Sequence, residues 1–209
     1  LIPQLLPGLR ITLIVTAGGC VVALVAAFLS GLGRRSEDVI IRSVSTIYIE
    51  VFRGTSALVQ LFWFYFALPQ LLNIRLDPIF VGILVLGLNI GAYGAEVVRA
   101  AINAVSPGQW AAAKALNLSD WQTMRHVVLP QCAQRLLPPL TGEAVSLVKE
   151  SSLLSIIGVA EITYHAKNLQ AHEYETWAAF LALAALYLCV TLPLSVLTRR
   201  AEARLAGPQ

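Results

Sequence analysis

Three ionisable residues interrupt a stretch of the chain that is otherwise apolar. Glu143, Lys149 and Glu150 lie within residues 136 to about 160. Ionisable groups inside an apolar span are costly, and they usually face a cavity or one another. A zwitterionic solute needs partners of both charge signs, which these side chains would supply. Their types and positions indicate part of a path for a small polar solute; the alternative is that Lys149 and Glu150 serve packing and gating.

Polar residues in a second apolar stretch extend this candidate path. Asn89 and Tyr93 lie in the uncharged run of residues 78–95. A side-chain amide at membrane depth must find a hydrogen-bond partner or line a wet path. We therefore predict a solute path that includes Asn89, Tyr93, Glu143, Lys149, Glu150 and Ser151.

The residue pattern does not support catalysis or metal binding. A membrane enzyme needs a nucleophile with a base, or a convergent set of metal ligands, and neither is evident. His165, His172 and Glu173 lack the spacing of a standard zinc site. The three widely spaced cysteines fit neither a disulfide framework nor a zinc pattern. We predict that the chain is not itself an enzyme and has no catalytic or metal-binding residues.

The composition places these residues in transmembrane helices. Of the 209 residues 57% are hydrophobic and 13% are charged, and the mean hydropathy is +0.71. Ordinary globular domains carry about a quarter charged residues. A membrane helix needs roughly 20 apolar residues, and four uncharged stretches are long enough: residues 11–33, 54–74, 78–95 and 176–198. With residues 136–160 as a fifth span, we predict an all-α membrane protein with five transmembrane helices in a single domain over residues 1–209.

Arginine and lysine predict the orientation of these spans, because short loops rich in them stay in the cytoplasm. We read the first stretch as a retained helix, since no basic region precedes it and no cleavage site follows it. With the N-terminus outside and the C-terminus in the cytoplasm, only Arg10, Arg75 and Lys167 fall outside. The formal net charge of +3 then reflects topology, so no nucleic-acid partner is needed. The cationic residues that fall inside are Arg34, Arg35, Arg42, Arg53, Arg99, Lys114, Arg125, Arg135, Arg199, Arg200 and Arg204.

The longest polar segment, about residues 100–135, is predicted to be a rigid cytoplasmic loop. The pattern of a capping box at residues 106–109 starts a helix, which should end at Asn117 because asparagine tolerates the left-handed conformation. The same pattern at residues 119–122 opens a second helix, which should end near Leu129, ahead of the next proline. Two short capped helices between membrane spans would give a stiff, alanine-rich surface for a partner.

Two further patterns predict one contact between helices and two contacts within a helix. Gly87, Gly91 and Gly94 recur at helical spacing, which predicts a seam where another backbone comes close. Glu96 with Arg99, and Glu50 with Arg53, have the spacing of ion pairs on one helix face, and structural pairing is the favoured interpretation of both.

The loop resembles the coupling loop of permease subunits from ATP-binding-cassette importers of the polar amino-acid type. Their pattern is Gly-Gln-x-Glu-Ala-Ala-x-Ala-Leu-Gly, followed by Leu-Pro-Gln. Residues 50–62, 88–99 and 147–153 are also similar to segments of that family. The chain departs from the pattern by having Ala111 in place of Glu and Asn117 in place of Gly. The resemblance assigns coupling to the ATPase to Gly108, Gln109, Ala111, Ala112, Ala113, Lys114, Leu116 and Asn117.

The resemblance implies the type I importer permease fold in a bacterial inner membrane. It also implies three kinds of protein partner: an ATPase dimer that binds ATP and Mg, a second permease subunit, identical or not, and a periplasmic or lipid-anchored solute-binding protein. The chain itself has no phosphate-binding loop of the P-loop pattern, so no cofactor is expected in it. Ectoine-like compatible solutes or polar amino acids are the expected substrates. The competing hypotheses are a secondary transporter and a passive channel for small polar solutes.

Overall fold

The computed structural model describes residues 2–173 and 176–205, and every regular element in them is helical. The all-α prediction is confirmed. In chain order the elements are α1 (Ile2–Gly33), α2 (Val39–Gly54), α3 (Ala57–Phe62), a first π-helical turn (Trp63–Ala67), α4 (Leu68–Leu72), α5 (Pro78–Asn103), α6 (Pro107–Ala115), α7 (Asp120–Thr123), a second π-helical turn (Met124–Val128), α8 (Leu129–Glu150), a 3-10 helix (Ser151–Ile157), α9 (Ile162–Glu173) and α10 (Thr176–Leu205).

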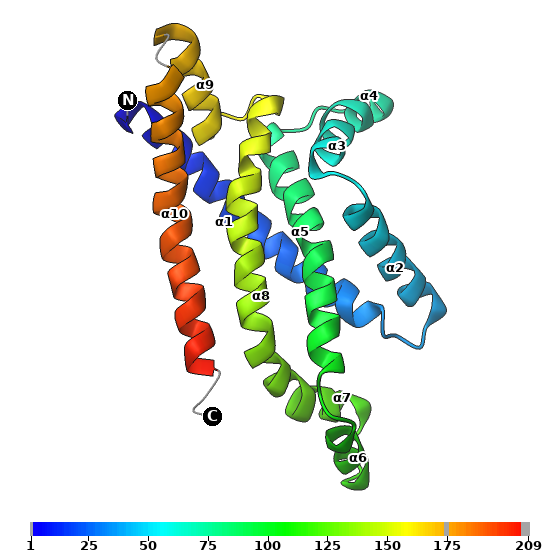
Figure 1. Ribbon diagram of the computed structural model, residues 1–209. Helices are drawn as coiled ribbons and strands as arrows, with labels where there is room; N and C mark the ends of the chain where they lie inside the picture. The colour runs from blue at the N-terminus through cyan, green and yellow to red at the C-terminus, as the bar shows by residue number, and fades with distance from the viewer. Residues whose placement is uncertain (1, 174–175, 206–209) are drawn as a thin grey trace.

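Within the described residues, three helices are long and apolar enough to cross a membrane: Pro3–Gly33 in α1, Pro78–Asn103 in α5 and Thr176–Arg200 in α10. Helix α8 is not among them, because its charged residues, glutamines and prolines make it less apolar. It nevertheless runs beside α5 and α10 over much of their length, while α1 crosses obliquely behind (Figure 1). The position of α8 agrees with its prediction as a span.

The second span differs from the prediction. The sequence predicted one membrane span over residues 54–74, whereas the structure has two helices, Val39–Gly54 and Ala57–Leu72, bent by 106°. Thr55 and Ser56 between them have extended backbone conformations. Counted as one broken span, the pair gives up to four spans by length and composition. Broken helices at membrane depth are tolerated where they line a cavity or are buried in protein.

The predicted glycine seam lies between α5 and α1. A Cβ atom added to Gly87 would lie 2.6 Å from Cβ of Val22. At Gly91 it would lie 2.8 Å from Cβ of Ala26, and Gly94 is packed in the same way against α1. Real Cβ atoms do not approach so closely, so larger residues would force the helices apart. The two helices are therefore held together as one unit.

Two prolines follow wide helical turns. The turn Trp63–Ala67 precedes Pro69, and the turn Met124–Val128 precedes Pro130. The proline ring clashes with the carbonyl four residues earlier, and a π-helical turn avoids this by bonding five residues back. Accordingly, the amide of Leu129 donates to the first carbonyl of the second turn. The prediction that the helix ends near Leu129 is wrong: the chain stays helical into α8.

The stretch between the 3-10 helix and α9 is fixed by a buried acidic residue. Glu161 is fully buried, and its carboxylate accepts hydrogen bonds from the amides of Thr163 and Tyr164, both at 2.8 Å. The Tyr187 hydroxyl donates to the same carboxylate over 3.1 Å. Such capping satisfies free amides at a helix start, so Glu161 fixes the start of α9 against α10.

Candidate functional site

A polar cavity of about 400 Å³ lies where the α2–α3 bend, α5 and α8 meet. This volume is large enough for a small solute. Apolar side chains contribute only part of its wall, and the rest is hydroxyl, amide and carboxylate. The lining residues are Thr55, Ser56, Ala57, Asn89, Ile90, Tyr93, Glu143, Ser146, Glu150 and Leu153.

Asn89 both lines this cavity and holds its wall together. Its amide donates to the carbonyl of Phe52 and to Oε1 of Gln60, each over 3.1 Å. The Gln60 amide in turn lies 2.7 Å from Oγ1 and 3.2 Å from the carbonyl of Thr55. These bonds satisfy polar groups that the helix break exposes, as buried polar groups require. Asn89 therefore joins α5 to the bend between α2 and α3.

Thr55 and Ser146 line the cavity and Gln60 supports its wall, and none of the three was predicted from the sequence. Gln60 is only 7% exposed although it lies in an apolar run. The argument applied to Asn89, that a buried amide needs a partner, would have identified Gln60 as well. Ser146 gives no comparable signal, because a serine in a helix satisfies its own hydroxyl easily.

Glu143 and Glu150 form the acidic side of the cavity. Seven residues separate them on α8, which is close to two helical turns, so both carboxylates lie on one face. Oε2 of Glu150 is buried, and no hydrogen-bond partner for it is found in the described part of the chain. Glu143 also borders a second, largely apolar cavity of about 220 Å³ between α1, α5 and α8.

The other two residues of the predicted path do not line the polar cavity. Lys149 is exposed, since neighbouring residues on a helix point about 100° apart. Ser151 is fully buried and donates to the carbonyl of Val148 over 2.7 Å. The structure thus brings together Asn89, Tyr93, Glu143 and Glu150, and leaves Lys149 and Ser151 outside.

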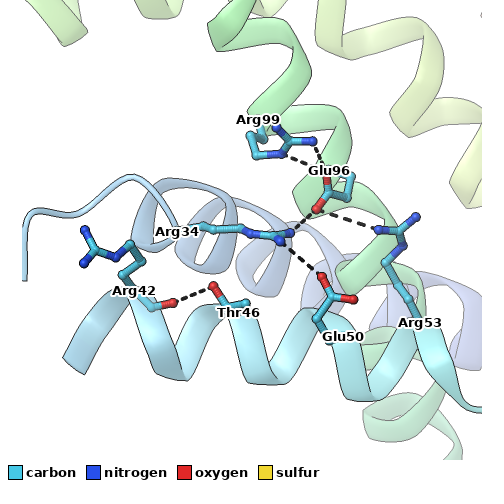
Figure 2. A network of polar contacts seen from close by, with 7 residues as sticks. All are labelled: Arg34, Arg42, Thr46, Glu50, Arg53, Glu96 and Arg99. Carbon is cyan, nitrogen blue, oxygen red and sulfur yellow. Dashed lines mark hydrogen bonds and ion pairs between the residues drawn. The ribbon is translucent and has the colours of Figure 1, made fainter. Parts of the chain in front are cut away.

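An ion-pair cluster, which we call the Glu96 cluster, joins the ends of α1, α2 and α5 (Figure 2). The Glu96 carboxylate pairs with Arg34, with Arg53 over 3.7 Å and with Arg99 over 2.6 Å. Arg34 also reaches Glu50 over 3.1 Å. The predicted Glu96–Arg99 pair is confirmed. Glu50 and Arg53, expected to pair with each other, have separate partners on other elements.

The loop that was predicted to couple to an ATPase exposes most of its predicted contact residues to solvent. Gly108, Gln109, Ala111, Ala112, Lys114, Leu116 and Asn117 are exposed, whereas Ala113 is only 2% exposed and packs within the chain. Leu116 and Trp121 are 73% and 67% exposed on the same part of the molecule. Exposed apolar groups beside small residues are typical of an interaction surface.

The two helices of the loop begin differently. Ser119 and Gln122 form the predicted capping box, with both reciprocal hydrogen bonds present. Ser106 starts α6, but its side chain makes no capping hydrogen bond, so the first predicted capping box is not formed. Asn117 has φ 52° and ends the helix as predicted. The bend therefore survives without the glycine of the family pattern.

Comparison with known proteins agrees with this architecture. A probable amino-acid ABC transporter permease of Sinorhizobium fredii is 40% identical over 183 residues, covering 85% of this chain and 77% of that protein. The glutamine transport system permease protein GlnP of Escherichia coli is 38% identical over 205 residues, with coverage of 98% and 94%. A solved amino acid ABC transporter with histidines is 34% identical, with a TM-score of 0.90 and coverage of 97% and 94%.

A more distant solved structure, the methionine ABC transporter MetNI in an inward-facing conformation, shares the fold. Its TM-score is 0.78 at 17% identity, covering 97% of this chain and 96% of that one. The family described as "binding-protein-dependent transport system inner membrane component" matches residues 23–207. This match covers most of the chain, and the two relatives named above are 40% and 38% identical to it. The chain therefore belongs to the binding-protein-dependent transport system inner membrane component family.

Proposed function

We propose that this chain is the permease subunit of an ATP-driven importer of polar amino acids, and that the polar cavity is part of the solute path. The observation that carries the proposal is the cavity itself, in which Asn89, Tyr93, Glu143 and Glu150 meet at membrane depth. Relatives named as amino-acid and glutamine permeases support amino acids rather than ectoine-like solutes. A secondary transporter and a passive channel are set aside because the family depends on a binding protein.

The exposed loop and the family to which the chain belongs support the partners that we propose. We assign residues 100–135 to coupling with an ATPase dimer, which would bind ATP and Mg in place of this chain. A second permease subunit, identical or different, would complete the path, and a periplasmic or lipid-anchored protein would deliver the solute. The chain would act as one transmembrane domain over residues 1–209 in a bacterial inner membrane.

The lining of the cavity leads to a prediction about substrate charge. In the described part of the chain this lining includes two carboxylates and no Lys, Arg or His, so an acidic solute would add like charge in a weakly screened site. We expect ATP-dependent uptake of glutamine into proteoliposomes that contain the whole complex. Uptake of glutamate, which has nearly the same size, should be at least about tenfold slower, equivalent to about 1.4 kcal/mol.

Binding of both amino acids to the solute-binding protein is measured separately, so that selection by that protein is not attributed to the permease. If the complex took up no amino acid at all in an ATP-dependent manner, the proposed function would be contradicted. Equal uptake of glutamine and glutamate, after correction for their different binding to the solute-binding protein, would contradict only the role of the two carboxylates.

The proposed orientation places the N-terminus outside and the C-terminus and residues 100–135 in the cytoplasm. Single cysteines at Gln4 and Asn117, in a background without Cys20, Cys132 and Cys189, should react with an impermeant thiol reagent from opposite sides of oriented vesicles. Both positions are exposed. Labelling of the Asn117→Cys variant from outside would contradict the topology and the coupling role together.

A further inference from the structure

We propose that the turn formed by Arg34 and Arg35 connects the coupling helix α6, through α2, to the α2–α3 bend that lines the polar cavity. In this proposal Arg34, Arg35 and Glu96 are positioning residues for transport. The idea rests on the proposed coupling role of residues 100–135, and the experiments below separate the two.

The first link runs from α6 to the end of α1. Arg35 lies just after α1, and its guanidinium carbon is 5.7 Å from the ring centroid of Trp110 on α6. Cations over an indole face are attracted by its quadrupole. Arg35 also donates to Oδ1 of Asn103, the last residue of α5, over 2.5 Å. A displacement of α6 would therefore act on Arg35 directly.

The second link runs from the turn to the Glu96 cluster. Arg34 is bonded to Arg35 through one peptide, yet its side chain reaches different partners. It pairs with Glu96 on α5 and, over 3.1 Å, with Glu50 on α2. Glu96 is only 19% exposed on its side chain, so its ion pairs are screened less than surface pairs. Movement of the turn would change how firmly α2 is held.

The third link runs from the cluster to the cavity. Arg53, in the last turn of α2, lies 3.7 Å from Glu96, the longest ion-pair distance in the cluster. Its guanidinium carbon is 5.4 Å from the ring centroid of Tyr93, which lines the cavity. Thr55, two residues further along the chain, lines the cavity as well. Because this ion pair is the longest in the cluster, we expect Arg53 to shift before the other members when the Arg34–Arg35 turn moves.

Transport by the whole complex provides the first test. Arg35→Ala and Glu96→Gln should each reduce uptake per ATP hydrolysed about tenfold, within the range usual for coupling between sites. ATPase attachment should be unchanged in both. If both residues act in one connection, the double variant should be no worse than either single variant. Independent effects would instead multiply to about a hundredfold loss, and that result would overturn the proposal.

Arg42→Ala is the matched control. It removes an arginine side chain from α2. Among the described residues the Arg42 guanidinium donates only one long hydrogen bond, 3.4 Å, to the carbonyl of Ser36, and it points away from the Glu96 cluster (Figure 2). Uptake per ATP should be unchanged. A loss as large as that of Arg35→Ala would contradict the proposal, as would a fall in assembled complex caused by Arg35→Lys, because the contacts would then be structural.

A reporter at the cavity separates this inference from the proposed function. A cysteine replacing Ser56, in the cysteine-free complex, should react with a thiol reagent at different rates with and without trapped nucleotide. Arg35→Ala should bring the two rates close to equality. If Arg35→Ala left the difference intact while Ala112→Arg in the loop removed it, α6 would still be the coupling helix and only the Arg34–Arg35 connection would be wrong.

Discussion

Replacing Ala112 with arginine is expected to weaken attachment of the ATPase or to uncouple ATP hydrolysis from uptake, while the membrane part stays folded. Ala112 is exposed on α6, and arginine is a good helix former. The long side chain would overfill a close contact, which typically costs about 1–3 kcal/mol. This corresponds to roughly 5- to 150-fold weaker binding of the ATPase. Affinity purification of the complex and substrate-stimulated ATP hydrolysis measure the two outcomes.

Ala171→Arg on α9 is a suitable control, because it makes the same change at another exposed helical position. It should leave ATPase attachment unchanged. Normal transport by Ala112→Arg, with substrate-stimulated hydrolysis intact, would show that α6 is not the coupling helix. The sequence offered Ala112 and Ala113 as equivalent sites, but Ala113 is buried within the chain. Its substitution would disturb the packing of α6 and would not isolate the contact with the partner.

Glu150→Gln is expected to reduce solute uptake strongly without reducing assembly. The side chain keeps its shape but loses a charge that faces the cavity. Hydrogen bonds to charged groups contribute about 1.5–3 kcal/mol, so uptake should fall roughly 10- to 150-fold. Initial uptake rates at several solute concentrations, together with the yield of the purified complex, provide the measurement.

Lys149→Met is the matched neighbour, because Lys149 is exposed and outside the cavity. It should change uptake much less than Glu150→Gln. Both residues were predicted to line the solute path, and the structure makes their expected effects unequal. A reduced yield of complex for Glu150→Gln, with normal uptake per assembled complex, would instead assign that carboxylate to packing.

Features that depend on residues close together in the sequence were predicted more successfully than contacts between distant segments. The Ser119 capping box, the left-handed Asn117 and the seam at Gly91 depend on residue type and local spacing, and all are present. Ion pairing of Glu50 was wrongly predicted because its partner, Arg34, lies across the turn between two helices. Helical spacing shows why Lys149 and Glu150 cannot share a face, so that part of the site was accessible from sequence.

Other features needed the three-dimensional arrangement. The bend after Gly54 was not predicted, because hydropathy averages over a window and ignores backbone direction. Its stability depends on Asn89 and Gln60, whose side chains meet from different helices over 3.1 Å. The continuation through Pro130 was missed for a different reason: the usual rule assumes regular α-helical bonding, whereas the preceding turn is wide.

The wide turn before Pro130 has a mechanical consequence for the acidic wall. Because the chain is helical without interruption from Asp120 to Glu150, torque applied at α7 would be delivered along α8 instead of being lost at a flexible joint. Glu143 and Glu150 differ by only about 20° around the helix axis and lie about 10 Å apart along it. Rotation of α8 would consequently withdraw or present both carboxylates at once, and the electrostatic potential of the cavity would switch in a single step.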